Sequence, residues 1–317
     1  MWLHTPRSEN LSFIGYNMHE YYQILLEERG LITIGGPDRR SFLQGLISND
    51  IERVGPDRAI WAALLTAQGK YLHDFFIIEI GDILYLDCEA ERLMDLGQRL
   101  SRFKLRADID LGMAQNFGVW VGYGDGALSG TSLNADPGIA VATGEGVVYC
   151  DPRLPEIGIR AILPKPVGAE TLEGLGAIPG DREKFEALRI SLGLPDGSRD
   201  MIVEKSILLE NNFDSLHGVD WNKGCYVGQE LTARTKYRGL IKKRLMPVVF
   251  EGTPAVAGAI VSAGGREAGE IRTVSGEMGL ALLRLEHVEE AESGGVNLEA
   301  GDSILTPRLP YWYVPSK

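Results

Sequence analysis

Apolar residues recur with two different spacings along the first two thirds of the chain. Short apolar runs bounded by glycine or polar turns indicate strands, whereas apolar residues repeated every three or four positions indicate helices. Helices are expected after Gly36-Pro37, over 91–103, and over 181–192, where Asp181 supplies an N-cap. The mixture predicts an α+β body. The strands predicted in it are 23–28, 31–34, 59–66, 71–80, 83–87, 117–121, 146–149 and 158–163.

The pattern changes from residue 244 onward, where short strands follow one another without a helical repeat. Turns such as Gly264-Gly265 separate them, which is typical of a small antiparallel barrel or sandwich. No low-complexity linker stands between the two regions, so we expect them to contact each other closely. The strands predicted here are 245–250, 259–262, 270–274 and 280–284.

The composition excludes several classes of protein. The chain has 317 residues, 44% of them hydrophobic, and a net charge of −12, which disfavours nucleic acid and anionic membranes unless a local basic patch exists. Its cysteines, Cys88, Cys150 and Cys225, are too few and too scattered for a disulfide scaffold, a zinc knuckle or a four-thiolate cluster, and we predict no metal site within one chain. No apolar run approaches the roughly 20 residues of a membrane span, and no secretory signal is recognisable. A cytoplasmic protein is therefore expected.

The segment around Cys225 carries the most informative chemistry. Gly224 and Gly228 bracket this thiol, and Lys223 precedes it by two positions. A helix that begins near 226–228 would put the sulfur at its positive end, and a helix start and a lysine both favour the thiolate. Cys225 is thus a candidate nucleophile, redox centre or metal ligand, with Lys223 as its activating cation. The alternative is a buried, inert cysteine.

A basic stretch follows, with six Lys or Arg and no acid between 231 and 250. In an acidic chain this local excess of positive charge could bind a carboxylate tail, a phosphate or RNA. The alternative is a solvated helix face on which Glu230 pairs with Arg234. The basic residues are Arg234, Lys236, Arg238, Lys242, Lys243 and Arg244.

Residues 223–230, KGCYVGQE, resemble the signature of the YgfZ family. These are folate-binding proteins of iron–sulfur cluster assembly, related in fold to the glycine cleavage T-protein, an aminomethyltransferase. Further blocks at 36–50, 65–74 and 188–195 are similar to the family in the same order. Residues 232–245 are especially similar to the branch that includes the mitochondrial cluster-assembly factors.

The resemblance implies two interwoven, ferredoxin-like α+β subdomains over 23–240 around a central folate cleft. It also implies a β-barrel domain over 241–317, and it leaves 1–22 as an N-terminal extension. The implied ligand is tetrahydrofolate or a derivative, with its glutamate tail toward the basic stretch. The folate-binding residues carried over are Asn49, Asp50, Asp74, Arg189, Tyr226, Gln229, Glu230, Arg234 and Arg238.

Two departures from the T-protein pattern bear on the activity. The paired acids of its hairpin read here as His73-Asp74, and Ser191 replaces its folate-binding glutamate. A general acid–base role requires the carboxylate to be present, so aminomethyl transfer is disfavoured. Asp74 alone could equally be a hydrogen-bonding residue at a strand end, and Asn49-Asp50 a turn.

The sequence therefore predicts a folate-dependent factor for assembly, maturation or repair of iron–sulfur clusters, with Cys225 as a reactive thiol and a transient cluster as cargo. Whether it catalyses a reaction stays open. One alternative is a folate-dependent one-carbon transferase, and another is an RNA-associated factor that affects tRNA modification. Direct RNA binding is disfavoured by the net charge and by the lack of aromatics among the basic residues, apart from Tyr237. The expected partners are reduced folate and iron–sulfur client or scaffold proteins, and no membrane.

Overall fold

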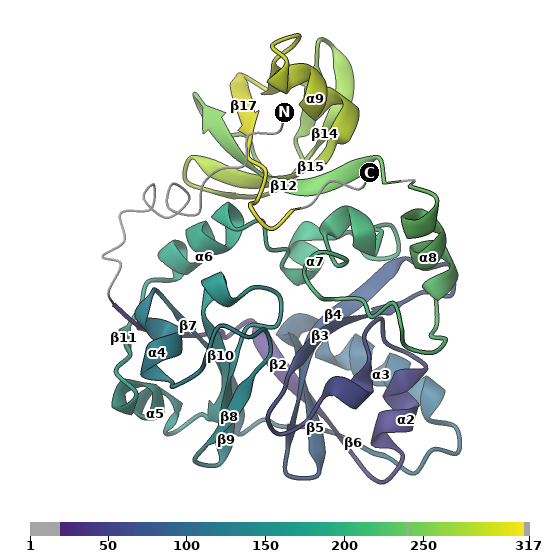
Figure 1. Cartoon of the computed structure of the whole chain (residues 1–317), viewed down its shortest axis with the longest axis vertical. Coiled ribbons are helices and arrows are strands. Elements are labelled where there is room, and N and C mark those ends of the chain that lie inside the picture. Colours follow the sequence, from purple (N-terminus) through teal and green to yellow (C-terminus); the bar gives the residue numbers. More distant parts are fainter. Residues whose placement is uncertain (1–19, 240, 314–317) are drawn as a thin grey trace.

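The computed structural model describes residues 20–239 and 241–313 as two β-sheets side by side, with a barrel above them (Figure 1). Most of the predicted N-terminal extension lies outside the described residues. None of the helices described is long and apolar enough to cross a membrane.

The first sheet is antiparallel, and helices cover one of its faces. Apolar residues of α2 (Arg39–Gln44) and α3 (Leu93–Lys104) form one core with this face, and Leu43 and Leu96 are fully buried in it. The predicted hairpin of β3 and β4 is confirmed, with Ile60 opposite Ile77. The strands, in sheet order, are β3 (Ile60–Leu65), β4 (Tyr71–Ile80), β5 (Ile83–Glu89), β2 (Arg29–Gly35) and β6 (Asp110–Met113).

The predicted helix after Gly36-Pro37 is shorter than the helical spacing of Phe42, Leu43, Leu46 and Ile47 indicates. It ends at Gln44, and Gly45 is its C-cap. Leu46 and Ile47 are nevertheless buried, because the chain turns there and Ile47 forms an isolated bridge with Leu64 of β3. Packing against the strand thus overrides the helical repeat.

The second sheet is antiparallel except for its short edge strand, β11, which pairs parallel to β1. Successive strands β1 and β2 belong to different sheets, so the chain interweaves the two halves, as the family resemblance implies. Trp61 and Phe76 from the first sheet share a core with Val121 and Ile162 from the second. The strands, in sheet order, are β11 (Ile178–Pro179), β1 (Tyr22–Leu25), β7 (Phe117–Tyr123), β10 (Ile159–Pro164), β9 (Gly146–Cys150) and β8 (Ala140–Thr143).

The C-terminal strands close into a six-stranded antiparallel barrel, which confirms the predicted architecture. Its interior is apolar, with Met246, Val248 and Phe250 buried at alternate positions of one strand. The strands, in barrel order, are β12 (Lys243–Glu251), β15 (Met278–Arg284), β14 (Arg266–Ser275), β13 (Ile260–Ala263), β16 (Leu298–Ala300) and β17 (Ser303–Pro307), with α9 (Leu285–Glu292) beside them.

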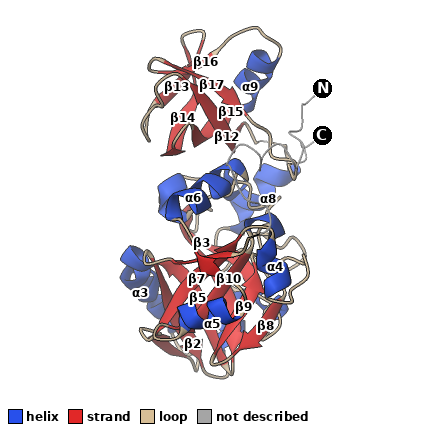
Figure 2. Cartoon of the chain, turned by 90° about the vertical axis from the view of Figure 1, so that its left-hand side faces the viewer, coloured by secondary structure: helices blue, strands red, loops and turns tan. Residues whose placement is uncertain are grey.

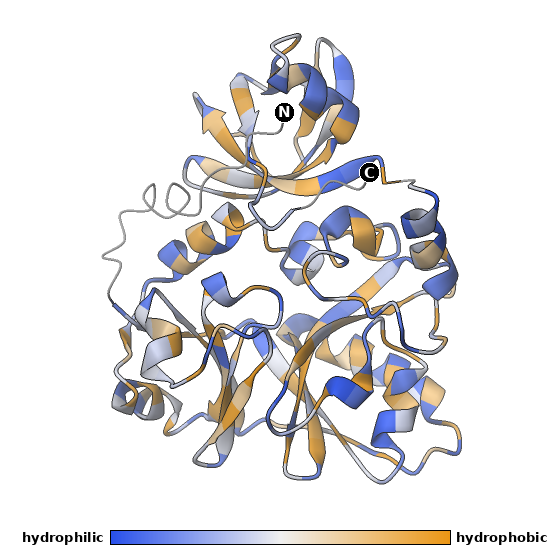
Figure 3. Ribbon diagram, viewed as in Figure 1, coloured by the Kyte–Doolittle hydropathy of each residue, from blue (hydrophilic) through white to orange (hydrophobic). Residues whose placement is uncertain are grey.

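Helix α6 (Arg182–Ser191) lies between the sheets and the barrel (Figure 2). The Asp181 side chain caps it by accepting the N–H of Glu183, as predicted. Its residue Ile190 packs against Leu245 of the barrel, while the opposite side of the helix faces the centre of the body. The apolar colours in Figure 3 follow the strands of both sheets. The remaining helices are α4 (Gly126–Gly130), α5 (Gly168–Gly174), α7 (Gly197–Asp200), and the 3₁₀ turns η1 (Ile51–Arg53), η2 (Ala90–Arg92), η3 (Pro155–Ile157) and η4 (Leu208–Asn211).

Candidate functional site

The loop that carries Cys225 is tied to the body on both sides of the thiol and leads into α8 (Gln229–Tyr237). On one side the Asp220 carboxylate accepts two backbone N–H groups of the loop, at 2.7 and 3.0 Å. On the other, the N–H of Val227 donates to the carbonyl of Gly45 at 3.0 Å. These contacts hold the loop in place while Cys225 stays exposed.

Lys223 anchors the same loop rather than activating its thiol. Its ammonium donates to the backbone carbonyls of Ile47 and Asn49, with Nζ–O distances of 2.7 and 2.6 Å. Burial lowers the pKa of Lys223 to about 8, against the opposing attraction of nearby carboxylates. The sequence predicts that this cation activates the Cys225 thiol as a catalytic group. In the structure its ammonium instead donates to the two carbonyls.

The helix after the signature begins slightly later than predicted. Gly228 has a left-handed backbone, with φ of +83°, so α8 starts at Gln229. Cys225 therefore lies before the first helical turn instead of at its positive end. The side-chain amide of Gln229 contacts the sulfur, with 3.7 Å from Nε2 to Sγ, and its oxygen accepts the N–H of Tyr226 at 3.0 Å. Gln229 is thus the polar group that orients this thiol.

The three thiols of the chain differ sharply in exposure. Cys88 and Cys150 are buried, and burial raises the pKa of each to about 12. Cys225 is exposed. A buried neutral thiol is a poor nucleophile and a poor metal ligand, so Cys225 is the thiol that can react or bind metal from outside.

The basic stretch does not form one continuous surface. Arg234 pairs with Glu230 one turn earlier, which is the alternative that the sequence left open. The Lys236 ammonium lies 3.7 Å from the centre of the Trp221 ring. Arg244 is buried and pairs with a carboxylate at 2.8 Å. None of these residues lines the central pocket described next, so the expected path for a folate tail is not formed.

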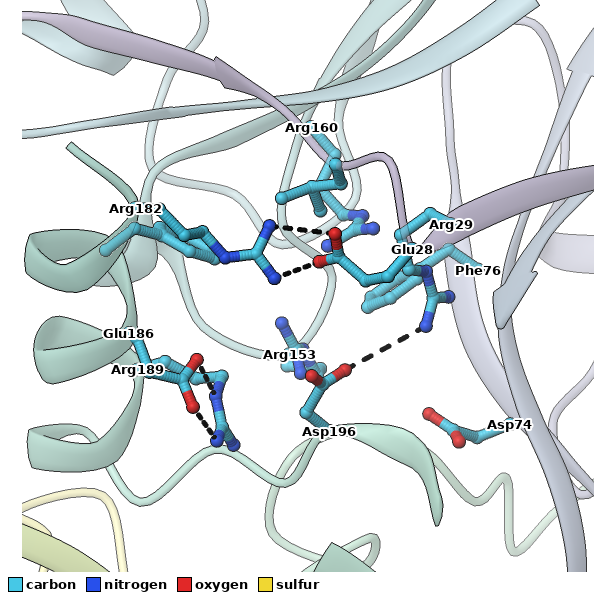
Figure 4. Close-up of a pocket in the computed structure, with 12 residues that line it drawn as sticks. Glu28, Arg29, Asp74, Phe76, Arg153, Arg160, Arg182, Glu186, Arg189 and Asp196 are labelled. Atoms are coloured by element: carbon cyan, nitrogen blue, oxygen red, sulfur yellow. Dashed lines mark hydrogen bonds and ion pairs between the residues drawn. The ribbon is translucent and has the colours of Figure 1, made fainter. Parts of the chain in front are cut away.

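A charged pocket lies where the two sheets meet α6 (Figure 4). Its guanidinium groups are matched by buried carboxylates: Asp87 receives Arg29 at 2.6 Å and also contacts Arg160. Arg153 pairs with Asp151 at 2.8 Å. Removal of one member of such a buried pair leaves an uncompensated charge, so the network holds the two halves together. The lining residues are Leu26, Glu28, Arg29, Asp74, Phe76, Arg153, Arg160, Arg182, Phe185, Glu186, Arg189 and Asp196.

Two predicted folate residues, Asp74 and Arg189, line this pocket. The Asp74 carboxylate accepts the indole N–H of Trp61 at 3.0 Å and the hydroxyl of Tyr71 at 2.8 Å. Burial raises the pKa of Asp74, although a nearby arginine opposes this. Arg189 is engaged by Glu186 at 2.7 Å. Both residues therefore already have protein partners.

The central pocket does not fit a folate in this arrangement. Its cavity volume is about 20 Å³, little more than one water molecule requires. Two aromatic side chains, Phe76 and Phe185, line this pocket. The Phe76 ring is covered by Arg160 at 3.9 Å and Arg153 at 4.9 Å from its centre. A bound pterin would have to displace these guanidinium groups.

The other predicted folate residues lie elsewhere. Asn49 borders a separate pocket, and the Asp50 side chain caps η1 by accepting the N–H of Glu52, as in the turn alternative. Ser191 is buried and donates to the carbonyl of Leu188 instead of facing the central pocket. The remaining ones, Tyr226, Gln229, Glu230, Arg234 and Arg238, lie on the cysteine loop and α8.

Sequence reasoning missed most of the pocket's arginines. The available signal was a charged residue inside an apolar strand, such as Arg160 within Ile159–Pro164. Its carboxylate partner Asp87 lies 73 residues away in sequence. Among the residues that the structure describes, no group of three or more His, Cys, Asp or Glu could hold a metal ion.

Comparisons with known proteins agree with this architecture. A family model described as "CAF17, C-terminal beta-barrel domain" matches residues 242–315. A crystal structure of glycine cleavage system aminomethyltransferase T from Bartonella henselae superposes with a TM-score of 0.76, over 98% of this chain and 91% of that one. Its sequence identity is 14%, so the similarity shows the fold alone.

Two curated relatives are similar over most of their length. The chain is 31% identical over 315 residues to "Iron-sulfur cluster assembly factor IBA57, mitochondrial" of Mus musculus, with 91% of this chain and 84% of that protein covered. The human protein of the same name is 30% identical over 316 residues, with the same shares covered.

These relatives are named mitochondrial, so the expected cytoplasmic location is wrong. The sequence argument rested on the lack of a secretory signal and of a membrane span, and neither feature separates the cytoplasm from an organelle. The identity over most of both chains, together with the T-protein fold and the CAF17-type barrel, shows that this chain belongs to the IBA57 family of iron–sulfur cluster assembly factors, the branch that residues 232–245 resemble.

Proposed function

We propose that this cluster assembly factor binds iron–sulfur cargo through Cys225, together with a partner chain that supplies the remaining ligands. The observation that carries the proposal is the exposure of Cys225, while Cys88 and Cys150 are buried with a pKa of about 12 each. A cluster needs about four protein ligands. Cys225, as the accessible thiol, can supply one of these ligands, and the partner chain would supply the others.

The chemical step is a ligand exchange without oxidation or reduction. The Cys225 thiol releases its proton to solvent, its sulfur bonds to iron, and a thiolate that held that iron leaves and takes up a proton. The side-chain amide of Gln229 supports this step, because its Nε2 lies 3.7 Å from the sulfur and fixes its position. The loop is tied to the body, so the thiol is presented without a large loss of conformational freedom on binding.

The segments that flank the cysteine loop in sequence favour a protein partner. Tyr237 is 74% exposed, and its ring meets Trp221 edge-on at 6.3 Å. Lys236 stacks on the same Trp221 ring. Trp221 is half-buried and Tyr237 exposed, and aromatic residues at a surface next to a cation are typical of the anchoring residues of protein interfaces. We therefore place the partner's contact on α8 and the loop before it.

The proposal is tested by offering the protein a [2Fe–2S] cluster held by dithiothreitol and recording the absorption and circular dichroism of the protein fraction. We expect wild type to take up iron and sulfide as a dimer or with added thiol as co-ligand, and Cys225→Ser to take up none. Cys150→Ala is the matched control, because it removes a buried thiol.

A second readout separates chemistry from folding. The melting temperature of Cys225→Ser should equal that of wild type, because the side chain is exposed. In cells that depend on this protein, Cys225→Ser should lose the activity of cluster-containing client enzymes, whereas Cys150→Ala should retain it. Equal cluster uptake by Cys225→Ser and wild type would overturn the proposal.

No step of this proposal passes through folate. Reduced folate is a ligand implied by the resemblance alone, and one-carbon transfer and an effect on tRNA modification are the alternatives that the sequence left open. The geometry supports cluster handling best, because Cys225 is accessible on a loop tied to the body, whereas the central pocket is filled by its own ion pairs.

A further inference from the structure

A second pocket lies near the start of β3, where the loop after α2 meets the segments around Asp136 and His217. Its cavity volume is about 120 Å³, several times what a single water molecule requires. We propose that this pocket binds a small molecule through a phosphate or carboxylate group. Its lining residues are Asn49, Arg53, Arg58, Ala59, Ile60, Trp61, Asp136, Pro137, Pro152 and His217.

The first argument is an uncommitted guanidinium group. The carboxylate nearest to Arg53 belongs to Asp220, and the two are 3.6 Å apart, too far for a good hydrogen bond. Among the residues described, no group accepts a hydrogen bond from Arg53. Its N–H donors make a long ion pair with Asp220 but no hydrogen bond, so they can donate to an anion.

The second argument is that the His217 backbone is held in an unfavourable conformation by hydrogen bonds from Asn49. Its backbone is left-handed, with φ of +59°, which costs a residue other than glycine about 1 kcal/mol or more. The Asn49 side chain holds this conformation by donating to the His217 carbonyl at 2.7 Å and to the Trp61 carbonyl at 2.8 Å. The backbone is thus fixed where the imidazole lines the pocket.

The imidazole itself can serve as a donor to the ligand. In the described part of the chain its ring nitrogens have no hydrogen-bond partner. Burial, and then the charge of Arg53, lower the pKa of His217, so the ring is neutral near pH 7 and keeps one N–H. Arg53 and His217 both line this pocket. An anion held between the two would reverse the effect of Arg53 on this pKa.

The rest of the pocket limits the ligand to a small acid. Arg58 supplies a second guanidinium, although Asp136 at 2.6 Å already engages it. Pro137 and Pro152 contribute apolar walls without N–H donors. A ligand that suits this lining has an anionic group near Arg53 and a short apolar part against the two prolines. The lining set carries two arginines and a single carboxylate.

The central pocket differs from the second one in how its guanidinium groups are paired. There each guanidinium is matched by a carboxylate, as Arg29 is by Asp87 at 2.6 Å, and an added anion would gain little. The second pocket has six times the cavity volume, and the ion pair of Arg53 with Asp220, at 3.6 Å, is too long for a hydrogen bond. An anion is therefore accommodated in the second pocket and not in the central one.

The test is a titration of the full chain with inorganic phosphate and, separately, with benzoate, at constant ionic strength set by chloride. The readout is the NMR signal of the His217 ring, assigned with His217→Gln. We expect a saturable shift with a Kd of about 1 mM and an upward change in the His217 pKa. The acid that binds more tightly shows whether the natural ligand carries a phosphate or a carboxylate.

Two variants decide the outcome. Arg53→Gln should weaken binding at least fivefold, whereas Arg266→Gln, an exposed arginine of the barrel, should leave it unchanged. The melting temperature of Arg53→Gln verifies that it is folded. A shift that never saturates with either acid, or equal binding by Arg53→Gln and wild type, would overturn the proposal.

Discussion

The ammonium of Lys223 donates a hydrogen bond to the backbone carbonyl of Asn49, 2.6 Å from Nζ to oxygen, across 174 residues of sequence. A second bond from the same nitrogen reaches the Ile47 carbonyl at 2.7 Å. These bonds join the loop that carries Cys225 to the loop after α2. The half-buried ammonium of Lys223 thereby gains two acceptors, and the two backbone carbonyls gain a donor.

Replacement of Lys223 by Met should change the pH dependence of stability. Burial lowers the pKa of Lys223 to about 8, below the roughly 10.4 of an unfolded chain. Between these pH values the unfolded state binds more protons, so the stability of wild type relative to Lys223→Met should rise with pH. At pH 7 the loss of two hydrogen bonds should cost the variant about 1 kcal/mol. Urea unfolding at pH 7 to 10 measures both, and parallel curves would contradict the assignment.

Gly228 should be irreplaceable for the loop, unlike Gly224. Gly228 has φ of +83°, and a Cβ there would clash with the carbonyl oxygen of Thr66 and lie 2.9 Å from the Leu65 Cβ. Gly228→Ala should therefore lower stability by about 2 kcal/mol or more. Nothing lies within 4 Å of a Cβ on Gly224, so Gly224→Ala should cost no more than about 0.5 kcal/mol. Thermal unfolding of both variants compares them, and equal melting temperatures would refute this reading of the turn.

The strands and helices with complete local signals are predictable from the sequence. The hairpin of Ile60–Leu65 and Tyr71–Ile80 has two apolar runs around a glycine turn, and α6 has both an N-cap and a stop signal. The start of α8 is misplaced because Gly228 adopts a left-handed backbone. The packing of that glycine against the hairpin is a contact between distant segments, which no local pattern shows.

The site is predictable only in part, for a similar reason. The exposure of Cys225 accords with its flanking glycines and polar neighbours, but the direction of Lys223 depends on carbonyls of another loop. The charged network of the central pocket is harder still to predict from the sequence. Arg29 and Arg160 share Asp87 from 58 and 73 residues away, and such pairing depends on how the two sheets meet.

Among the thiols, Cys225 should react first with iodoacetamide at pH 7. Cys88 and Cys150 are buried, with a pKa of about 12 each, so they should react only when the chain unfolds. Mass spectrometry of the alkylated peptides gives the three rates. Gln229→Leu, which removes the donor 3.7 Å from the sulfur, should slow Cys225 a few-fold. Comparable rates for all three thiols in the native protein would contradict the assignment of Cys225.

A titration with 5-formyltetrahydrofolate, followed by tryptophan fluorescence, should show no saturable binding up to about 0.1 mM. The central cavity holds about 20 Å³, and Arg160 covers the Phe76 ring at 3.9 Å. Saturable binding that Asp74→Asn abolishes would show that the guanidinium groups move aside and that folate is a ligand of this chain. Arg266→Gln, at an exposed arginine of the barrel, is the control that should have no effect in either case.

His73 stands where the T-protein hairpin has the first of its two acids, and it should make the fold sensitive to acid. Its Nε2 lies 2.8 Å from the Asp95 carboxylate. Burial, helped by Arg92 and opposed by Asp95, lowers the His73 pKa to about 4, below the roughly 6.5 of an unfolded chain. Between these values the unfolded state binds more protons, so stability should fall by up to about 3 kcal/mol as pH drops from about 6.5 toward 4. Urea unfolding at pH 7, 6, 5 and 4.5 should show a steeper loss for wild type than for His73→Gln, and equal slopes would mean that His73 is already charged in the folded protein.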